Sequence, residues 1–396
     1  MISRKASGVS PSPTLAIDTK FKEMKANGED VVGFGCGEPD FDTPEHIKKA
    51  AIDAIMAGET KYTPASGTLK LRKAVADKFL RENGLSYAPT DIVVSNGAKH
   101  SLVNAFMAIC NPGDEVIIPA PYWVSYPEMV KLADGVPVVV NATEDKDFKV
   151  TVADLESALT DKTVAIVINS PSNPTGMVYT EQELRTIADF AVKNDLYVIS
   201  DEIYEHLIYE GSHVSIASFG EEIKKRTIVI NGVSKTFAMT GWRIGYTAAA
   251  PEIAKAMANI QSHASSNPNS IAQAATIAAL EGGMDEVEVM KKHFVRRRDF
   301  MVDMFNSIDG VSCRRPQGAF YIMMNIDELI GRTMYGKTIK NADDFSALFL
   351  DVAKVAVVPG TGFGADNYVR WSYATSMDTI VDGIERLKKF LNAADI

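Results

Sequence analysis

Six short runs of apolar, mostly β-branched residues recur between residues 92 and 231. They are apolar at successive positions rather than at every second one, which is typical of strands covered on both faces of a mostly parallel sheet. The runs predict strands at 92-IVVS-95, 115-EVIIP-119, 136-VPVVV-140, 164-VAIVINS-170, 196-LYVIS-200 and 227-TIVIN-231.

A helical pattern separates the fourth and fifth runs, in 180-TEQELRTIADFAVKNDL-196. Thr180 and Glu183 have the spacing of a capping box, which marks the start of a helix. Apolar residues then recur at helical spacing, at Leu184, Ile187, Ala188, Ala191 and Val192. Because strand, helix and strand follow in that order, we predict a βαβ crossover and an α/β fold.

The two ends of the chain have a different character. Residues 1–44 are rich in Gly, Pro and Ser, and a long charged helical pattern at 285–308 leads into a mixed α/β tail. We predict a large α/β domain at 45–285, with a mostly parallel mixed sheet flanked by helices. Residues 1–44 and 286–396 would together form a smaller α/β domain.

Composition narrows the choice of partners. The 41 Lys and Arg against 51 Asp and Glu give a net charge of −10, which argues against nucleic acid as a partner. No apolar run approaches the ~18 residues of a membrane helix, and we see no signal peptide. The three cysteines and six histidines lack metal-ligand spacing, so we expect no metal site, and reduced thiols in the cytoplasm.

Polar residues directly follow four of the predicted strands. In an open α/β sheet, ligands bind at the carboxyl ends of the strands. The four ends carry a helix start at 96–99, Asn173, Asp201 with Tyr204, and Lys235. Each residue alone is more often a cap, a turn residue, a packing residue or a solvated charge. Their convergence on four strand ends predicts one ligand site.

Two lone cations stand in the stretch 231-NGVSKTFAMTGWRIGY-246. Lys235 and Arg243 are either surface charges, or a nucleophile beside a guanidinium that holds an anion. The glycine-rich stretches at 33–37 and 359–364 are not a GxGxxG motif that opens a helix after the first strand, and no GxxxxGK[ST] is present. The sequence therefore does not support a nicotinamide site or a P-loop nucleotide site.

The chain resembles the fold type I pyridoxal phosphate (PLP) enzymes over nearly its whole length, and more closely the class I aminotransferases. Within that class it is similar to the bacterial aspartate aminotransferases, including those that also accept prephenate. The resemblance rests on 37-GEPDFDTPEHI-47, 61-KYTPASGTLKLR-72, 121-PYWVSYPEM-129, 170-SPSNPTG-176, 200-SDEIYEHL-207, 234-SKTFAMTGWRIGY-246 and 370-RWSYA-374.

The resemblance implies PLP as the cofactor, bound by the large domain. Lys235 would form the covalent link to PLP and then carry the proton that moves during the reaction. Asp201 would pair with the pyridine nitrogen and keep it protonated. Tyr204 and Asn173 would hydrogen-bond the phenolic oxygen of the ring, and Trp123 would stack on the ring.

The resemblance also implies how the phosphate is held. Arg243 and the backbone N–H groups at the start of the helix after residue 97 would bind it. Tyr62 would reach the phosphate of a neighbouring subunit, which implies a homodimer with shared active sites. The phosphate-binding residues would be Gly97, Ala98, Lys99, Ser234, Arg243 and Tyr62.

Substrate recognition would need a second anion site. Arg370 would bind the α-carboxylate with a bidentate fork, unless it is a salt bridge between domains, and Gly37 would add a backbone N–H. Lys99 and Thr14 stand where this subgroup recognises the side-chain carboxylate, although Lys99 is otherwise a solvated helix-start residue. Trp123 and Asn173 would also line the substrate site.

These roles predict an aspartate aminotransferase that transfers the amino group reversibly from L-aspartate to 2-oxoglutarate by a ping-pong mechanism. Other aminotransferase specificities (aromatic, alanine or prephenate) and a PLP-dependent C–S lyase remain open. Ser10 replaces a basic residue that is frequent in prephenate-accepting relatives, and Gly232 replaces a frequent hydroxyl. A ligand-sensing domain of a transcription regulator would need a preceding helix-turn-helix, for which the motifs starting at residue 37 leave no room.

Overall fold

The central sheet has seven strands, and all six predicted strands are among them. The computed structural model describes residues 2–11 and 13–393, and the side chains of residues 13–15 lie outside that description. The strand order is β2-β8-β7-β6-β5-β3-β4. The strands are β2 (Ile92–Ser95), β3 (Glu115–Ala120), β4 (Val136–Asn141), β5 (Thr163–Asn169), β6 (Tyr197–Asp201), β7 (Thr227–Gly232) and β8 (Gly245–Ala248).

Strand β8 was not predicted from the apolar pattern. Its sequence, 245-GYTA-248, is short and contains one large apolar residue. It runs antiparallel between β2 and β7, whereas the other neighbouring strands are parallel. The predicted mostly parallel mixed sheet is therefore confirmed, and β8 is what makes it mixed.

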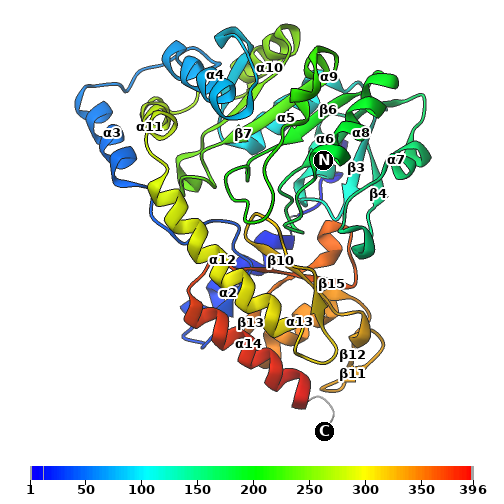
Figure 1. The fold of residues 1–396 in the computed structure, drawn as a ribbon. Helices are drawn as coiled ribbons and strands as arrows, with labels where there is room; N and C mark the ends of the chain where they lie inside the picture. The colour runs from blue at the N-terminus through cyan, green and yellow to red at the C-terminus, as the bar shows by residue number, and fades with distance from the viewer. Residues whose placement is uncertain (1, 12, 394–396) are drawn as a thin grey trace.

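Helices cover the central sheet on both faces (Figure 1), and successive side chains of an inner strand alternate between the two helical layers. In β3, Val116 and Ile118 pack with helices α5, α6 and α10, while Ile117 packs with α7, α8 and α9. Burial on both faces explains why the strand sequences are apolar at successive positions. The first layer consists of α5 (Ala98–Ile109), α6 (Ser125–Leu132) and α10 (Pro251–Ala264). The second layer consists of α7 (Val152–Ala158), α8 (Glu181–Lys193) and α9 (Glu221–Arg226).

Helix α8 begins as its sequence predicts. The Thr180 hydroxyl accepts a hydrogen bond from the Glu183 backbone N–H at 3.3 Å, and the Glu183 carboxylate accepts one from the Thr180 N–H at 2.7 Å. Both halves of the predicted capping box are therefore present. Helices α3 (Glu45–Met56), α4 (Leu69–Asn83) and α11 (Ser270–Glu281) form a further group beside β2 and β8.

A second, antiparallel sheet lies in the lower part of Figure 1 and has the order β14-β15-β10-β9. The N-terminal segment joins this part of the fold, because β1 pairs in parallel with β13. The strands of the second sheet are β9 (Ser312–Cys313), β10 (Tyr321–Asn325), β14 (Val358–Pro359) and β15 (Tyr368–Ser372). Two further strand pairs accompany it: β1 (Val32–Gly33) with β13 (Val355–Ala356), and β11 (Thr333–Met334) with β12 (Lys337–Thr338).

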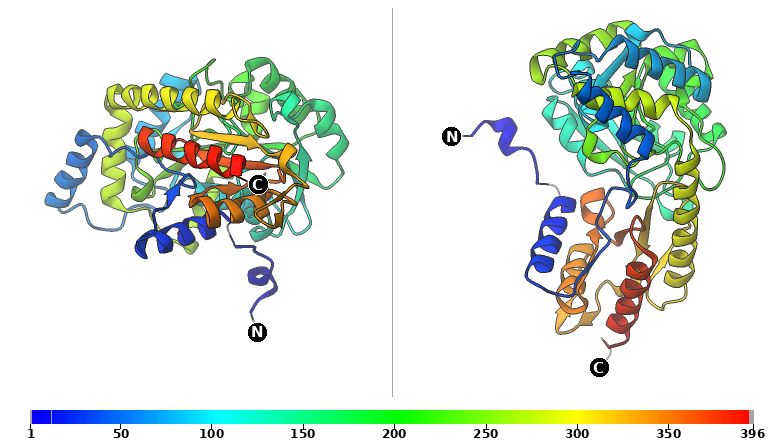
Figure 2. Two further views of the ribbon diagram at one scale, coloured as in Figure 1. Left: turned by 90° about the horizontal axis from the view of Figure 1, so that it is seen from below. Right: turned by 90° about the vertical axis from the view of Figure 1, so that its left-hand side faces the viewer.

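Helix α12 (Asp285–Phe305) runs from the central sheet towards the second sheet (Figures 1 and 2). It begins where the sequence places the boundary between the large and small domains. The limits 45–285, 1–44 and 286–396 stay a prediction. The other helices in the lower part are α2 (Pro13–Ala26), α13 (Ala342–Ala353) and α14 (Met377–Asn392), and α1 (Arg4–Ser7) precedes them in the chain.

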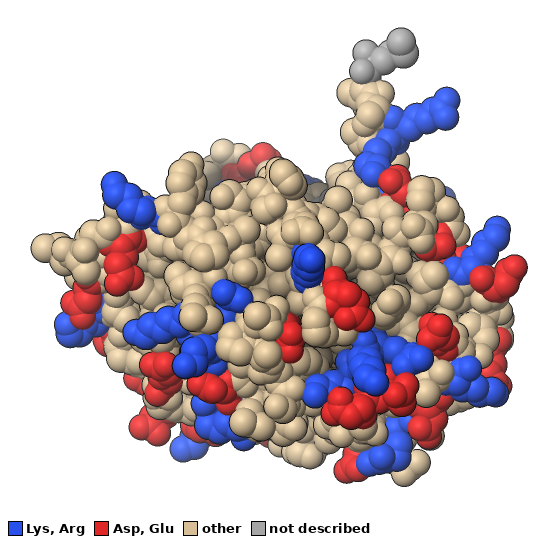
Figure 3. All heavy atoms as spheres, turned by 90° about the horizontal axis from the view of Figure 1, so that it is seen from above, with Lys and Arg blue, Asp and Glu red and all other residues tan. Residues whose placement is uncertain are grey.

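The described helices include none that combines the length and apolar character needed to cross a membrane. On the face shown in Figure 3, Lys and Arg side chains are interspersed with Asp and Glu. This face has no continuous basic stripe of the kind that tracks a nucleic-acid backbone.

Candidate active site

Lys235 lies just after β7 and is reached by the N-terminal segment. Its Nζ donates a hydrogen bond to the backbone carbonyl of Gly37, so residues far apart in the sequence meet at this amine. Burial lowers the pKa of Lys235 to about 8, because the charged form loses solvation. A larger share of the amine is then neutral near physiological pH, which is the form that attacks a carbonyl carbon.

Asp201 ends β6 and is buried. Its carboxylate accepts hydrogen bonds from the Tyr126 hydroxyl at 2.6 Å and from the Ile203 N–H at 3.3 Å. Burial raises the pKa of Asp201 to about 6, against the opposing effect of these two donors. Among the described residues, no Lys, Arg or His forms an ion pair with it. A buried carboxylate without a cation suits a cationic nitrogen on a ligand.

Tyr126 is a site residue that the sequence did not reveal. It lies in α6, its side chain is fully buried, and its ring meets Trp123 edge-on with 5.4 Å between centroids. The only signal was its position in the quoted 121–129 motif, where Trp123 alone received a role. Tyr126 fixes the orientation of the Asp201 carboxylate.

Asn173 and Arg370 are brought together from the two parts of the fold. The Asn173 N–H donates to Asn169 Oδ1 at 2.8 Å, and its Oδ1 accepts from the Arg370 guanidinium at 2.9 Å. A second Arg370 nitrogen donates to the Gly35 carbonyl at 3.0 Å. The structure brings these two predicted site residues into contact, and their roles stay a prediction.

Arg370 is buried to 2% exposure without a counter-ion in the described part of the chain. Its Nε has no hydrogen-bond partner there. Burial lowers the pKa of Arg370, but a guanidinium remains protonated in proteins. A buried charge that is not neutralised by the protein is costly unless a ligand supplies the counter-charge. Arg370 therefore suits an anionic ligand, and among the described residues it forms no salt bridge between the two parts of the fold.

The helix start after β2 forms a second anion site. Gly97 has φ of 87°, and a Cβ there would lie 2.9 Å from the Arg243 guanidinium carbon. The Ala98 and Lys99 N–H groups donate to no described residue, as expected in the first turn of a helix. These N–H groups and Arg243 fit a phosphate.

Gly232, the sequence departure beside this site, has a structural explanation. It pairs with Gly245 across β7 and β8. A Cβ on Gly232 would lie 3.0 Å from both the Gly245 Cα and the Ile244 carbonyl oxygen. A hydroxyl-bearing residue would therefore push β8 away. Ser234, two residues later, is buried at the same turn.

Lys99 and Trp123 also lie side by side. The Lys99 ammonium is 4.8 Å from the centroid of the Trp123 ring, a cation–π distance. Burial and the nearby Arg243 lower the pKa of Lys99. Lys99 forms no ion pair with a described carboxylate, so its charge is free to attract an anionic side chain of a ligand.

Tyr62 is not joined to this cluster, and the predicted residue Thr14 has a side chain that lies outside the described part of the chain. Tyr62 is 92% exposed, and its hydroxyl makes no hydrogen bond with the described residues. It borders a cavity of about 660 Å³ between α3 and α11. Thr14 falls in α2, but its side chain lies outside what the structure describes.

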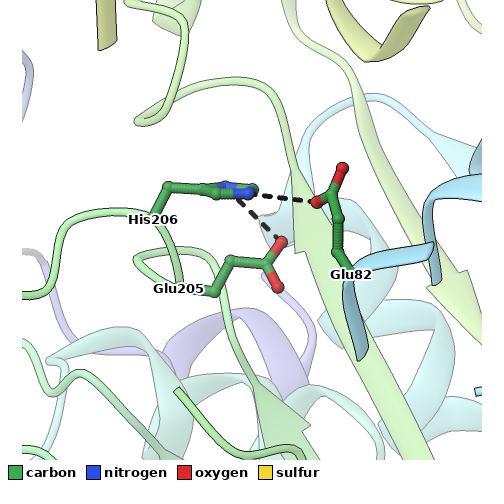
Figure 4. Close-up of side chains that lie close together, drawn as sticks. All are labelled: Glu82, Glu205 and His206. Carbon is green, nitrogen blue, oxygen red and sulfur yellow. Dashed lines mark hydrogen bonds and ion pairs between the residues drawn. The ribbon is translucent and has the colours of Figure 1, made fainter. Parts of the chain in front are cut away.

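The stretch 202–206 also contributes Glu205 and His206 to a separate, partly buried charge network (Figure 4). His206 lies between Glu82 at 3.1 Å and Glu205 at 3.7 Å. Glu205 also pairs with Lys78, which is 1% exposed. Burial raises the pKa of Glu205, but Lys78 and the neighbouring histidines outweigh it and hold that pKa below its usual range. The Lys78 ammonium already supplies the cation that these carboxylates need.

Comparisons with known proteins fit this geometry. A model of the family described as aminotransferase class I and II matches residues 29–387. The chain is 50% identical over 392 residues to the aspartate aminotransferase of Bacillus sp. strain YM-2, covering 99% of each chain. The chain belongs to the class I and II aminotransferase family. This aminotransferase is therefore a PLP-dependent enzyme, as the resemblance implied.

Two further relatives bear on the aminotransferase. It is 45% identical over 395 residues to the aspartate/prephenate aminotransferase of Nitrosomonas europaea, covering 99% of this chain and 100% of the relative. The crystal structure of the aspartate aminotransferase of Rhizobium meliloti matches with a TM-score of 0.96 at 44% identity, and 99% of each chain is covered. The α/β fold and the aminotransferase activity are thus confirmed.

The residues of the aminotransferase fit PLP on three counts. The amine of Lys235 has a lowered pKa, Asp201 is a buried carboxylate without a cation, and the α5 start with Arg243 forms an anion site. These groups match the aldehyde, the pyridine nitrogen and the phosphate of PLP. The assignment of individual residues to these parts of PLP stays a prediction.

Proposed function

We propose that this aminotransferase transfers the amino group of L-aspartate to 2-oxoglutarate by a ping-pong mechanism. The observation that carries the proposal is a pair of cations, Arg370 and Lys99, that have no carboxylate partner among the described residues. Each substrate of this reaction is a dicarboxylate, and two separate cations suit two carboxylates. The names of the relatives support the same choice.

Arg370 binds the α-carboxylate. Its guanidinium is held by the Asn173 amide oxygen and the Gly35 carbonyl, so its orientation is fixed before substrate arrives. Lys99 attracts the second carboxylate from its position over Trp123. Aspartate and 2-oxoglutarate each have two carboxylates, whereas phenylalanine and alanine have only the α-carboxylate.

Bound PLP supplies an electron sink that makes the Cα proton of the amino acid acidic. Lys235 Nζ takes this proton, because it is neutral more often than an ordinary lysine. The negative charge of Asp201 stabilises a protonated pyridine nitrogen. Tyr204 and Asn173 donate to the phenolic oxygen, and the α5 start with Ser234 and Arg243 anchors the phosphate.

We also propose that the active form is a cytoplasmic homodimer. Tyr62 is 92% exposed in the segment between α3 and α4, and both helices carry further exposed apolar side chains; exposed apolar surface of this kind typically marks a protein interface when it is contiguous. A partner subunit would place Tyr62 at the phosphate of the other site. The exposed large apolar side chains of α3 and α4 are Ile52, Ile55, Met56, Leu69 and Leu80.

A spectrum of the PLP-loaded protein tests the proposed function. We expect a visible absorption band that disappears when aspartate is added and returns with 2-oxoglutarate. A band that responds to phenylalanine or alanine but not to aspartate would contradict the role of Lys99. The variant Lys99→Met tests this role directly. Its absorption band should respond much less to aspartate than that of the wild type, while its response to alanine should change less.

Prephenate is a second candidate acceptor, because the Nitrosomonas relative carries it in its name. Ser10 stands where many prephenate-accepting relatives have a basic residue, and its backbone N–H donates to Glu128 at 2.9 Å. This acidic neighbour does not attract a second carboxylate. We expect weaker activity with prephenate than with 2-oxoglutarate, which parallel rate measurements compare directly.

A further inference from the structure

Tyr321 lies between the two halves of the site and has no role in the predicted set. It is the first residue of β10, is fully buried, and its ring contacts that of Tyr204 edge-on at 6.0 Å between centroids. Its position therefore joins the small sheet to the stretch that follows β6.

The strand register brings Tyr321 to Arg370. In the antiparallel pair of β10 and β15, Met323 stands opposite Arg370 and Tyr321 opposite Ser372. Residues two apart along a strand share a face, so Tyr321 and Arg370 are diagonal neighbours on one face. The guanidinium carbon of Arg370 lies 4.4 Å from the centroid of the Tyr321 ring. This is a cation–π contact on a buried arginine.

The hydroxyl of Tyr321 reaches a different group. It lies 2.9 Å from the Tyr204 hydroxyl, and either oxygen can be the donor. It also lies 3.4 Å from where a Cβ on Gly37 would be. Burial raises the pKa of Tyr321 to about 12 and that of Tyr204 well above its ordinary value. Both hydroxyls therefore keep their protons at physiological pH.

Counting protons gives the direction of this hydrogen bond in the working enzyme. A tyrosine hydroxyl has one proton to donate. In the proposed function Tyr204 donates it to the phenolic oxygen of the cofactor. The bond between the two tyrosines then requires Tyr321 as the donor and Tyr204 as the acceptor.

We propose that Tyr321 is a positioning residue with two separable parts: its hydroxyl directs the Tyr204 proton to the cofactor, and its ring supports the Arg370 guanidinium. The inference rests on the proposed function, since it assumes that Tyr204 faces the phenolic oxygen. The hydroxyl acts on the electronic state of the bound cofactor, and the ring acts on carboxylate binding.

The variant Tyr321→Phe removes the hydroxyl and keeps the ring. A donor to the phenolic oxygen favours its ionised form, so loss of alignment should raise the apparent pKa at which bound PLP changes its visible absorption. We expect a rise of about half a unit to one unit, the worth of one hydrogen bond. The affinity for maleate, a dicarboxylate without an amino group, should stay nearly unchanged.

A double-mutant cycle shows whether the hydroxyl acts through Tyr204. Tyr204→Phe should raise the same apparent pKa, and adding Tyr321→Phe should bring no further shift. Tyr321→Leu removes the ring as well, so maleate binding should weaken by about tenfold relative to Tyr321→Phe. Tyr373→Phe is the control, because this buried hydroxyl of the small domain donates to the Ala319 carbonyl at 3.2 Å; it should titrate like the wild type.

Two results would overturn the inference. The proposal requires that Tyr321→Phe titrate differently from the wild type, so an unchanged titration would exclude a role for the hydroxyl. Additive shifts in the double variant would show that Tyr321 does not act through Tyr204. A wild-type protein that shows no visible band with PLP would instead reject the proposed function itself.

Discussion

Two buried cations, Lys78 and Arg370, differ in one decisive respect. They are 1% and 2% exposed, respectively. Lys78 pairs with Glu205 and also donates to the Asn83 amide oxygen at 2.9 Å. Arg370 contacts only uncharged acceptors and aromatic rings among the described residues. Burial alone therefore does not indicate a binding site, whereas burial without a counter-charge does.

The surroundings follow the same division. Asp201 and Tyr204 face the candidate site, while Glu205 and His206, only a few residues later, face the charge network around Lys78. One short stretch after β6 thus contributes to both regions. In the network, Lys78 and Glu205 neutralise each other within the protein. In the candidate site, Arg370 has no counter-ion among the described residues, so a ligand can supply the opposite charge.

The largest expected effect comes from Lys78→Met. Removing one member of a buried ion pair leaves Glu205 buried with an uncompensated charge, which costs about 3–5 kcal/mol of folding stability. Arg370→Met is the matched control, since it removes a cation without a partner and should leave stability equal or higher. Denaturant unfolding of both PLP-loaded variants measures this. Equal losses in the two variants would remove the distinction between the regions.

The next effect is the loss of activity in Arg370→Met. Truncating one partner of a buried charged contact costs about 2–5 kcal/mol, which is roughly a 30- to 5,000-fold fall in kcat/KM for aspartate. The visible absorption of bound PLP should persist, because Arg370 is assigned to the substrate. Steady-state kinetics and a spectrum together check this. Unchanged kcat/KM would show that Arg370 is a structural residue only.

Sequence reasoning and structure agree best where local rules suffice. Asp201 ends a buried strand, and Asn173 and Lys235 come a few residues after buried strands. The rule for strand ends of an open sheet therefore locates all three. Arg370 was identified through the family resemblance, because its place depends on the register of β10 and β15. Tyr126 and Tyr321 were missed for the same reason: their contacts with Asp201 and Tyr204 span 75 and 117 residues.

The network around Lys78 was also beyond prediction. Its members come from α4, β7 and the stretch after β6, and no spacing in the sequence links them. Strand β8 was missed because a short stretch that begins with glycine carries too little apolar pattern. Distant pairing, rather than local preference, decides all of these positions.

The smallest expected effect is a pH dependence that separates the two regions. Glu205 has a pKa below its ordinary value of 4.5, through Lys78, His206 and His213. A lowered carboxyl pKa stabilises the fold above the unfolded pKa, and this stability is lost as the pH falls towards the folded value.

The stability gap between wild type and Lys78→Met should therefore narrow by about 1–2 kcal/mol when the pH falls from about 6 to 3. Without Lys78, the pKa of Glu205 lies closer to its value in the unfolded chain. Acidification therefore lowers the free energy of unfolding of the variant less than that of the wild type. The Asn83 and Asn231 amides still donate to Glu205, at 2.9 and 2.7 Å, and keep the narrowing incomplete. Urea unfolding at both pH values measures this narrowing. Arg370→Met is the control, because its difference in free energy of unfolding from the wild type should not change with pH. A gap that does not change with pH would mean that Lys78 stabilises the fold through packing rather than through the charge of Glu205.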